Sequence, residues 1–142
     1  MCLDTITKRP FPSEEEVTRY KILRIRGNKI MFPNRHDFQF QMDFKTLDWP
    51  SIEFNTWLEA KQLKEVRCEK DWKTSYLPGF HIFKSLEWAK QALDGIDCTY
   101  LRRIDGDVIF EVKAKEIYLE GIQAGIPTEV CSFLKVIKKL PV

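Results

Sequence analysis

The amino-acid sequence predicts an α+β fold, in which a twisted, mostly antiparallel sheet of about six or seven strands carries one or two packed helices. Three observations lead to this prediction. Tight-turn dipeptides separate apolar runs, several segments alternate apolar and polar residues, and one segment carries both a helix cap and a helix stop. Because the chain has 142 residues, 44% of them hydrophobic, we expect residues 1–142 to form a single domain.

The first 19 residues are expected to form a loose N-terminal arm. Pro10, Pro12 and the acidic run 14–16 argue against a packed element. Ser13 and Glu16 have the spacing of a capping box, but no sustained apolar periodicity follows them. At most one helical turn is therefore expected over residues 1–19.

A hairpin and a further strand are predicted next. The apolar segments 20–26 and 29–32 flank Gly27-Asn28, a dipeptide typical of a two-residue hairpin turn. Segment 38–44 places aromatic residues and a methionine at every second position, which is the pattern of a strand with one buried face.

Two helices are predicted in the middle of the chain. Ser51 is placed to cap a helix over residues 52–64, where apolar residues form an imperfect stripe. A short strand at 80–83 follows a Pro-Gly turn, and Ser85 is placed to cap the helix after it. Gly95 stands where the left-handed residue that ends a helix is expected.

The C-terminal part is expected to contain four strands, over residues 99–104, 108–114, 117–120 and 129–138. Asp105-Gly106 joins the first two as a hairpin, with 108, 110, 112 and 114 on the buried face. The chain is expected to break between the last two strands at Gly121, Gly125 and Pro127.

Composition argues against several classes of function. The net charge of +2 lacks the strong basic excess of nucleic-acid-binding proteins, so a nucleic-acid partner is not expected. The basic clusters, Arg102-Arg103 and Lys135 with Lys138 and Lys139, are interpreted as solvated strand edges. No apolar run is long enough to span a bilayer, and the first residues lack the pattern of a signal peptide, so a cytoplasmic protein is expected.

Neither a metal nor an organic cofactor is expected. The four cysteines, Cys2, Cys68, Cys98 and Cys131, have no zinc-ligand spacing, and a disulfide framework is not expected without a secretion signal. Asp105, Asp107 and Glu111 could surround a cation, but hairpin chemistry accounts for the first two. Phosphate-loop and dinucleotide-binding glycine patterns are absent from the sequence.

Two residues are candidates for chemistry. His81 alternates with the apolar Phe80 and Ile82, so its imidazole lies on the other face of the strand. It is either a strand-end histidine that satisfies a neighbouring backbone group or a side chain that lines a cleft. Cys2 would become an N-terminal nucleophile if Met1 were removed, with the α-amino group as its base; otherwise it lies on the arm or in the core.

The order of several motifs resembles known proteins. The Met-Cys-Leu start and the segment Gly79-Phe-His-Ile-Phe83 before a helix resemble a group of small proteins of bacteria and their phages. About two thirds of the chain also looks distantly like the ADP-ribosyltransferase-like fold. That resemblance implies a first strand at 20–24, with Arg24 or Arg26 near a ligand. It also implies that His81 lies near the place of the family's middle-strand tyrosine, and that the catalytic glutamate is one of Glu111, Glu116 and Glu120.

Three functions follow as hypotheses. The first is a non-catalytic module that binds a nucleotide-like small molecule in a cleft lined by Arg24, Tyr76, His81 and Arg102; a phage-encoded protein of this kind would sequester a host signalling nucleotide in the host cytoplasm. The second is an enzyme, either ADP-ribosyltransferase-like or using Cys2 as an N-terminal nucleophile. The third is a protein–protein interaction domain or a homo-oligomer that pairs through an exposed strand edge.

Overall fold

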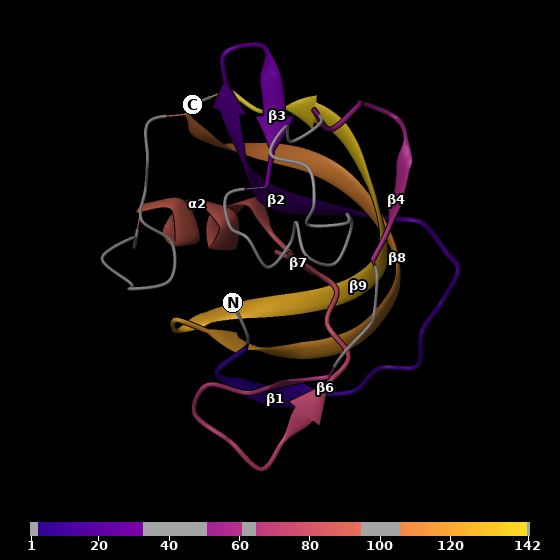
Figure 1. Cartoon of the computed structure of the whole chain (residues 1–142), viewed down its shortest axis with the longest axis vertical. Coiled ribbons are helices and arrows are strands. Elements are labelled where there is room, and N and C mark those ends of the chain that lie inside the picture. Colours follow the sequence, from indigo (N-terminus) through magenta and orange to yellow (C-terminus); the bar gives the residue numbers. More distant parts are fainter. Residues whose placement is uncertain (1–2, 33–50, 61–64, 95–105, 142) are drawn as a thin grey trace.

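The computed structural model describes residues 3–32, 51–60, 65–94 and 106–141 (Figure 1). These residues contain nine strands and one helix: β1 (Thr5–Lys8), β2 (Val17–Arg26), β3 (Lys29–Met31), β4 (Trp57–Glu59), β5 (Val66–Arg67), β6 (Ser75–Tyr76), β7 (Phe80–Ile82), α2 (Leu86–Asp94), β8 (Asp107–Gln123) and β9 (Ile126–Lys139). The described part of the chain has no helix of the length and apolarity needed to cross a membrane.

The long hairpin of β8 and β9 is the frame of the main sheet. Seven strands form this sheet in the order β3-β2-β8-β9-β4, with β1 also paired to β8 and β7 to β9, and all these pairs are antiparallel. β5 and β6 form a separate two-stranded sheet. The expectation of a mostly antiparallel sheet is confirmed, and the structure shows that this sheet is curled (Figure 1). The expected content of about six or seven strands and one or two helices is met only in part. The described residues contain two further strands outside the main sheet, and one helix.

The main sheet curls until two of its strands meet. β8 and β9 bend together into an arch, and β7 crosses the concave side of this arch (Figure 1). Tyr20 at the start of β2 and Phe83 after β7 exchange two backbone hydrogen bonds of 3.0 and 2.8 Å. Backbone pairing therefore runs in a ring from β2 through β8, β9 and β7 back to β2.

Three apolar clusters form the core. The largest includes Leu23, Phe80, Phe110 and Leu134, from β2, β7, β8 and β9. A second lies between the N-terminal strand and the lower part of the arch, and includes Leu3, Tyr76 and Leu119. The third lies under α2 and includes Ile22, Phe83, Ala89, Leu93 and Ile109. The single described helix thus covers the side of β2 and β8 that faces away from the largest cluster.

Several local predictions are confirmed. β2 and β3 form the expected hairpin around Gly27-Asn28, and Gly27 takes the positive φ of 62° that this turn requires. Ser85 caps α2, since its Oγ accepts a 3.2 Å hydrogen bond from the backbone N–H of Trp88. β7 buries Phe80 and Ile82, with His81 on the other face. The positions of Gly95 and of segments 38–44 and 99–104 lie outside the described residues.

The prediction of a loose arm over residues 1–19 is wrong for much of its length. Leu3 is fully buried, its N–H donates a 2.8 Å hydrogen bond to the Tyr76 hydroxyl, and residues 5–8 pair with β8 as β1. From Val17 onward the chain belongs to β2. The prolines and acidic residues fall in the exposed connection between β1 and β2, whereas the apolar residues on either side of them pack against the sheet.

The prediction of a helix at 52–64 is wrong over the described residues 52–60. Three backbone N–H groups there bind neighbouring strands: Ile52 donates to Ile30, Asn55 to Val136 and Ala60 to Ser132, at 2.8–2.9 Å. These bonds replace the hydrogen bonds that a helix would make within itself, and residues 57–59 form β4 against β9. The Oγ of Ser51 accepts a 3.0 Å hydrogen bond from the N–H of Ile30 in β3, so this side chain binds a strand and does not cap a helix.

The expected breaks at Gly121 and Pro127 are also wrong, because β8 runs through Gly121 and β9 runs through Pro127. A Cβ at Gly121 would collide with the Thr5 carbonyl oxygen of β1, so glycine allows β1 to approach. The expected strands 108–114 and 117–120 are parts of one strand, β8, in which Glu116 has a φ of 55° and the pairing with β9 shifts register between Ile117 and Leu119. The expected turn at Gly125 and a strand over 129–138 are confirmed.

Candidate functional site

A cavity opens where the connection between β1 and β2 passes over the arch. Its volume is about 210 Å³, and its walls come from the connection, β2, β8, β9 and the start of the segment before α2. The lining residues are of two kinds, ionisable ones (Glu15, Arg19, Lys84, Lys115, Glu116, Glu120, Glu129) and others (Pro10, Phe11, Ser13, Val17, Ile117).

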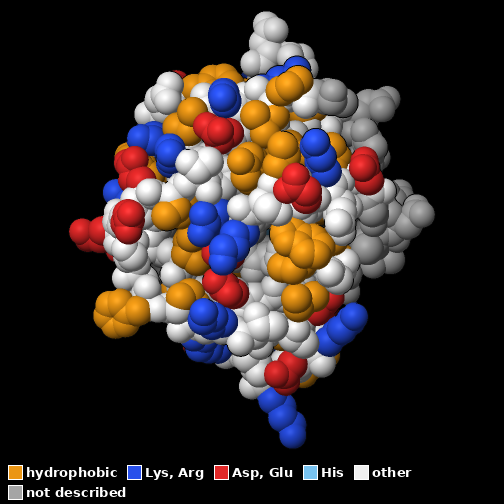
Figure 2. Space-filling model, turned by 180° about the vertical axis from the view of Figure 1, so that it is seen from behind, with side chains coloured by type: hydrophobic (Ala, Val, Ile, Leu, Met, Phe, Trp, Pro, Cys, Tyr) orange, Lys and Arg blue, Asp and Glu red, His pale blue; other side chains and the backbone are white. Residues whose placement is uncertain are grey.

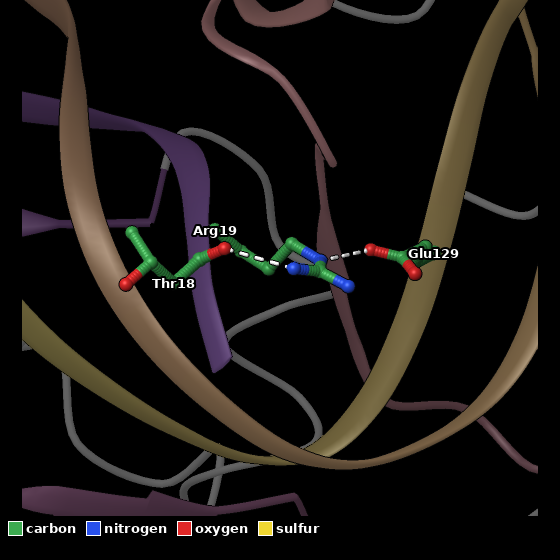
Figure 3. Close-up of polar contacts among 3 residues, drawn as sticks. All are labelled: Thr18, Arg19 and Glu129. Carbon is green, nitrogen blue, oxygen red and sulfur yellow. Dashed lines mark hydrogen bonds and ion pairs between the residues drawn. The ribbon is translucent and has the colours of Figure 1, made fainter. Parts of the chain in front are cut away.

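An ion pair between Arg19 and Glu129 forms the inner wall of this cavity. Nε of Arg19 lies 2.6 Å from Oε1 of Glu129, and Nη1 donates a 2.9 Å hydrogen bond to the Thr18 carbonyl (Figure 3). The side chains are only 17% and 7% exposed, so each charge has lost most of its contact with water. In such surroundings each charged group depends on its partner for stabilisation far more than a charged group in a surface ion pair does.

The curl of the sheet brings these two residues together. Arg19 lies opposite Val112 on β8, which in turn lies opposite Val136 on β9. Glu129 precedes Val136 by seven residues, roughly 23 Å along an extended strand. A flat sheet would therefore hold the two charges far apart. They meet because β9, through β7, curves back toward β2, and Figure 3 shows the Arg19 side chain crossing between the two strands.

Two further cations line the cavity. Lys84 is exposed, and among the described residues no carboxylate lies within ion-pair distance of its ammonium group. The Nζ of Lys115 lies 4.4 Å from the centre of the Trp57 ring. Together with Arg19 they place three positive groups around a cavity that also contains four glutamates. The cavity thus offers partners to both acidic groups and hydrogen-bond donors.

The connection of residues 9–16, here called the strap, forms the outer wall. Its Phe11 side chain is 95% exposed and lines the cavity mouth. The strap is tied to β8 where the N–H of Glu116 donates a 2.7 Å hydrogen bond to the Ser13 carbonyl. Glu116, which makes this contact, adopts a left-handed conformation that non-glycine residues rarely take.

Of the four residues predicted to line a ligand cleft, the three that the structure describes do not line this cavity, whereas Glu116 and Glu120, two of the three glutamates that the resemblance suggested, do. Arg24 donates two hydrogen bonds of 2.7 and 3.2 Å to the Asp107 carboxylate, near the beginning of β8. Tyr76 is 3% exposed, and it packs against Leu119 near the other end of β8. The Nδ1 of His81 lies 2.8 Å from Oε1 of Gln123. Arg24, Tyr76 and His81 therefore belong to different local structures.

Other predicted site residues have separate outcomes. Cys2, Arg102 and Asp105 lie outside the described residues. Asp107, considered as a cation ligand, instead binds the guanidinium of Arg24. In the described ranges no group of three or more His, Cys, Asp or Glu side chains is arranged to hold a metal ion.

Sequence reasoning missed Arg19, Lys84 and Glu129. In the structure β2 is buried on both faces, since Ile22 and Leu23 are adjacent and both are buried. The alternation along this strand therefore does not indicate which of its charged residues points inward and requires a partner. Nothing in the sequence indicates that the partner is Glu129, which is 110 residues away.

Comparison with protein families, with curated proteins and with solved structures finds no match to this chain. Figure 2 shows that acidic, basic and hydrophobic side chains are intermixed over the face opposite the view of Figure 1, and that none of these kinds alone covers it.

Proposed function

We propose that the protein binds a nucleotide-like small molecule, without catalysis, at the cavity beside Arg19. The observation that carries this proposal is the incomplete use of the Arg19 guanidinium. Nε and Nη1 have hydrogen bonds, whereas Nη2 makes none with the described residues, and Arg19 lines the cavity (Figure 3). A guanidinium with free N–H groups at a cavity wall is well suited to a phosphate or carboxylate oxygen.

Lys84 supports an anionic group at the same place. Its ammonium is exposed and lines the cavity, so it can approach a bound anion without first breaking an ion pair. Glu129 holds the guanidinium in place, which reduces the loss of side-chain entropy when a ligand binds. A phosphate at this place would thus bind the guanidinium of Arg19, which Glu129 holds in place, and the exposed ammonium of Lys84.

The remaining lining matches the other parts of a nucleotide. The carboxylates of Glu116 and Glu120 are acceptors for sugar hydroxyl groups. Phe11 presents an exposed ring at the mouth, on which a base would stack. Because about 210 Å³ is below the usual range for a whole ligand, the phosphate end would lie inside and the base over the strap.

A binding role is proposed in place of an enzymatic one because of the cavity's residue types. Among the described lining residues, Ser13 is the single hydroxyl nucleophile and no histidine or cysteine accompanies it. The Ser13 Oγ accepts a 3.1 Å hydrogen bond from the N–H of Glu15, as in a local turn. A protein of this kind would act by lowering the free concentration of its ligand, which is how a sequestering protein of a phage would work.

Thermal unfolding in the presence of nucleotides tests the proposal. The panel contains a nucleoside monophosphate, ADP-ribose and cyclic nucleotides, each at millimolar concentration. A ligand at 100 times its Kd stabilises the folded state by about 2.7 kcal/mol, and we expect at least one of the panel to raise Tm. Mass analysis should recover that nucleotide unchanged. A flat Tm across the whole panel would refute the proposal.

Variants with matched controls locate the site. Lys84→Gln and Phe11→Ser should each weaken binding by about tenfold while leaving Tm without ligand unchanged, since both side chains are exposed. Lys90→Gln on α2 and Trp72→Ser remove an exposed lysine and a 67% exposed ring outside the cavity, and both should bind as the wild type does. If the two control variants weaken binding as much as Lys84→Gln and Phe11→Ser do, the nucleotide binds outside this cavity.

A further inference from the structure

The face of β4, β9 and β8 opposite the largest apolar cluster carries a group of lysines and aromatic rings. In one cross-strand row Trp57 lies opposite Lys135, which lies opposite Lys113; in the next row Phe133 lies opposite Lys115. Residues two apart on a strand share a face, so the five side chains lie together. We call this group the basic–aromatic face. Its neighbours in sequence, Ala114 and Leu134, point the other way into the core.

Two of the three lysines of this face, Lys115 and Lys135, lie against its rings. The ammonium of Lys115 is 4.4 Å from the Trp57 ring centre and 5.2 Å from that of Phe133. The ammonium of Lys135 is 4.7 Å from the same Trp57 ring. Lys113 donates a 2.7 Å hydrogen bond to the Thr18 hydroxyl. Two of the three ammonium groups thus lie over aromatic rings, and the third, on Lys113, is held at the Thr18 hydroxyl of β2.

The positive charge of this face is only partly balanced. Lys135 lies 3.7 Å from Glu16, whose side chain is 48% exposed. In the part of the chain that the structure describes, Lys113 and Lys115 have no carboxylate within ion-pair distance, although Glu59 and Glu111 border the face in the strand register. Two lysines therefore remain available to a negatively charged partner.

We propose that the basic–aromatic face binds single-stranded nucleic acid. Aromatic side chains on adjacent strands, with cations beside them, allow bases to stack while phosphates meet the lysines. Lys113 and Lys115 are two residues apart on β8, about 7 Å, a spacing comparable to that of successive nucleotides in an extended chain. An approaching base would displace the Lys115 ammonium from the Trp57 ring. This exchange is favourable because stacking of a base stabilises more than an exposed ammonium–ring contact does.

The overall charge of +2 does not reveal such a face, because the face depends on local grouping and Trp57 comes from a distant part of the chain. The face is also distinct from the proposed nucleotide cavity. Four of its five residues do not line that cavity, and only Lys115 belongs to both. Variants at Lys113 and Trp57 therefore test this proposal independently of the cavity.

The test measures binding of a fluorescently labelled single-stranded dT oligonucleotide of about 12 nucleotides by anisotropy, from 50 to 200 mM salt. Three neutralised phosphates would give a slope of about −2 in log K against log salt, and Lys113→Gln should make this slope shallower by about 0.7. Trp57→Leu should weaken binding roughly 5- to 150-fold, the range for loss of one stacked base. Trp72→Leu is the control and should bind as the wild type does.

Three results would overturn the proposal. The first is no binding at 50 mM salt with 100 µM protein, a concentration chosen to reveal weak complexes. The second is a salt slope that Lys113→Gln leaves unchanged. The third is stronger binding to vesicles that contain phosphatidylserine than to the oligonucleotide, which would assign the face to an anionic membrane surface. If Trp57→Leu does not fold, as judged by circular dichroism, Lys113→Gln and Lys135→Gln decide the outcome, since neither side chain is in the core.

Discussion

Replacing Glu129 by alanine should destabilise the protein far more than replacing an exposed glutamate. The substitution leaves the Arg19 guanidinium, which is only 17% exposed, without its 2.6 Å partner. Removing one partner of a fully buried pair costs about 3–5 kcal/mol. Because Arg19 also borders a cavity that water can enter, we expect the lower figure of about 2–3 kcal/mol in the free energy of unfolding.

This loss can be converted to a change in melting temperature. The entropy of unfolding is about 2.1 cal/mol/K per residue, or about 0.3 kcal/mol/K for 142 residues. A loss of 2–3 kcal/mol should thus lower Tm by roughly 7–10 °C. Urea unfolding followed by circular dichroism measures the free energy directly, and calorimetry measures Tm.

Glu16→Ala is the matched control. Glu16 also faces a cation, Lys135, but at 3.7 Å and with a 48% exposed side chain. We expect it to cost about 0.5 kcal/mol or less. The double variant Arg19→Leu/Glu129→Leu should be more stable than the sum of the single losses predicts, because no charge is then left buried without a partner. Equal costs for Glu129→Ala and Glu16→Ala, or strict additivity in the double variant, would refute the reasoning.

Two further predictions concern the backbone. Gly121→Ala should cost about 2 kcal/mol or more, because the new Cβ meets the Thr5 carbonyl; hydrogen exchange should show that β1 loses protection first, and unchanged protection would contradict the packing described for this strand. Ser85→Ala should cost about 1 kcal/mol in urea unfolding through loss of the α2 cap, whereas Ser85→Asp should retain most of the stability; equal losses for both would show that the cap is not the cause.

Local signals in the sequence predicted the local structures well. Gly27-Asn28 produced a hairpin because glycine can take the positive φ of the turn, and Ser85 produced a capped helix because its hydroxyl reaches a backbone N–H three residues on. The alternation around His81 also predicted which residues of β7 are buried. Each of these outcomes depends on residues within a few positions of one another.

The failures have a different physical origin. Residues 52–60 have a stripe that suits a helix, but their N–H groups find acceptors on β3 and β9, whose nearness the local sequence does not encode. The candidate site depends even more on distant parts of the chain, since Arg19 and Glu129 meet only after the sheet has curled. The side chains of Arg24, Tyr76 and His81 are suited to ligand binding, but each has a distant partner within the fold: Asp107, the Leu3 amide and Gln123.

The pairing ring has a consequence for how the protein forms during synthesis. β1 and β2 pair with β8, and β4 and β7 pair with β9, so these four strands are made before their partners exist. Until residues 107–139 have left the ribosome, the earlier part of the chain has exposed apolar residues and unpaired strands, which are the usual origin of aggregation. The β8–β9 hairpin closes locally, and the remaining strands must then find it across long stretches of chain, a topology that folds slowly. A chaperone that shields β2 would therefore be needed most during translation of the segment between β7 and β9.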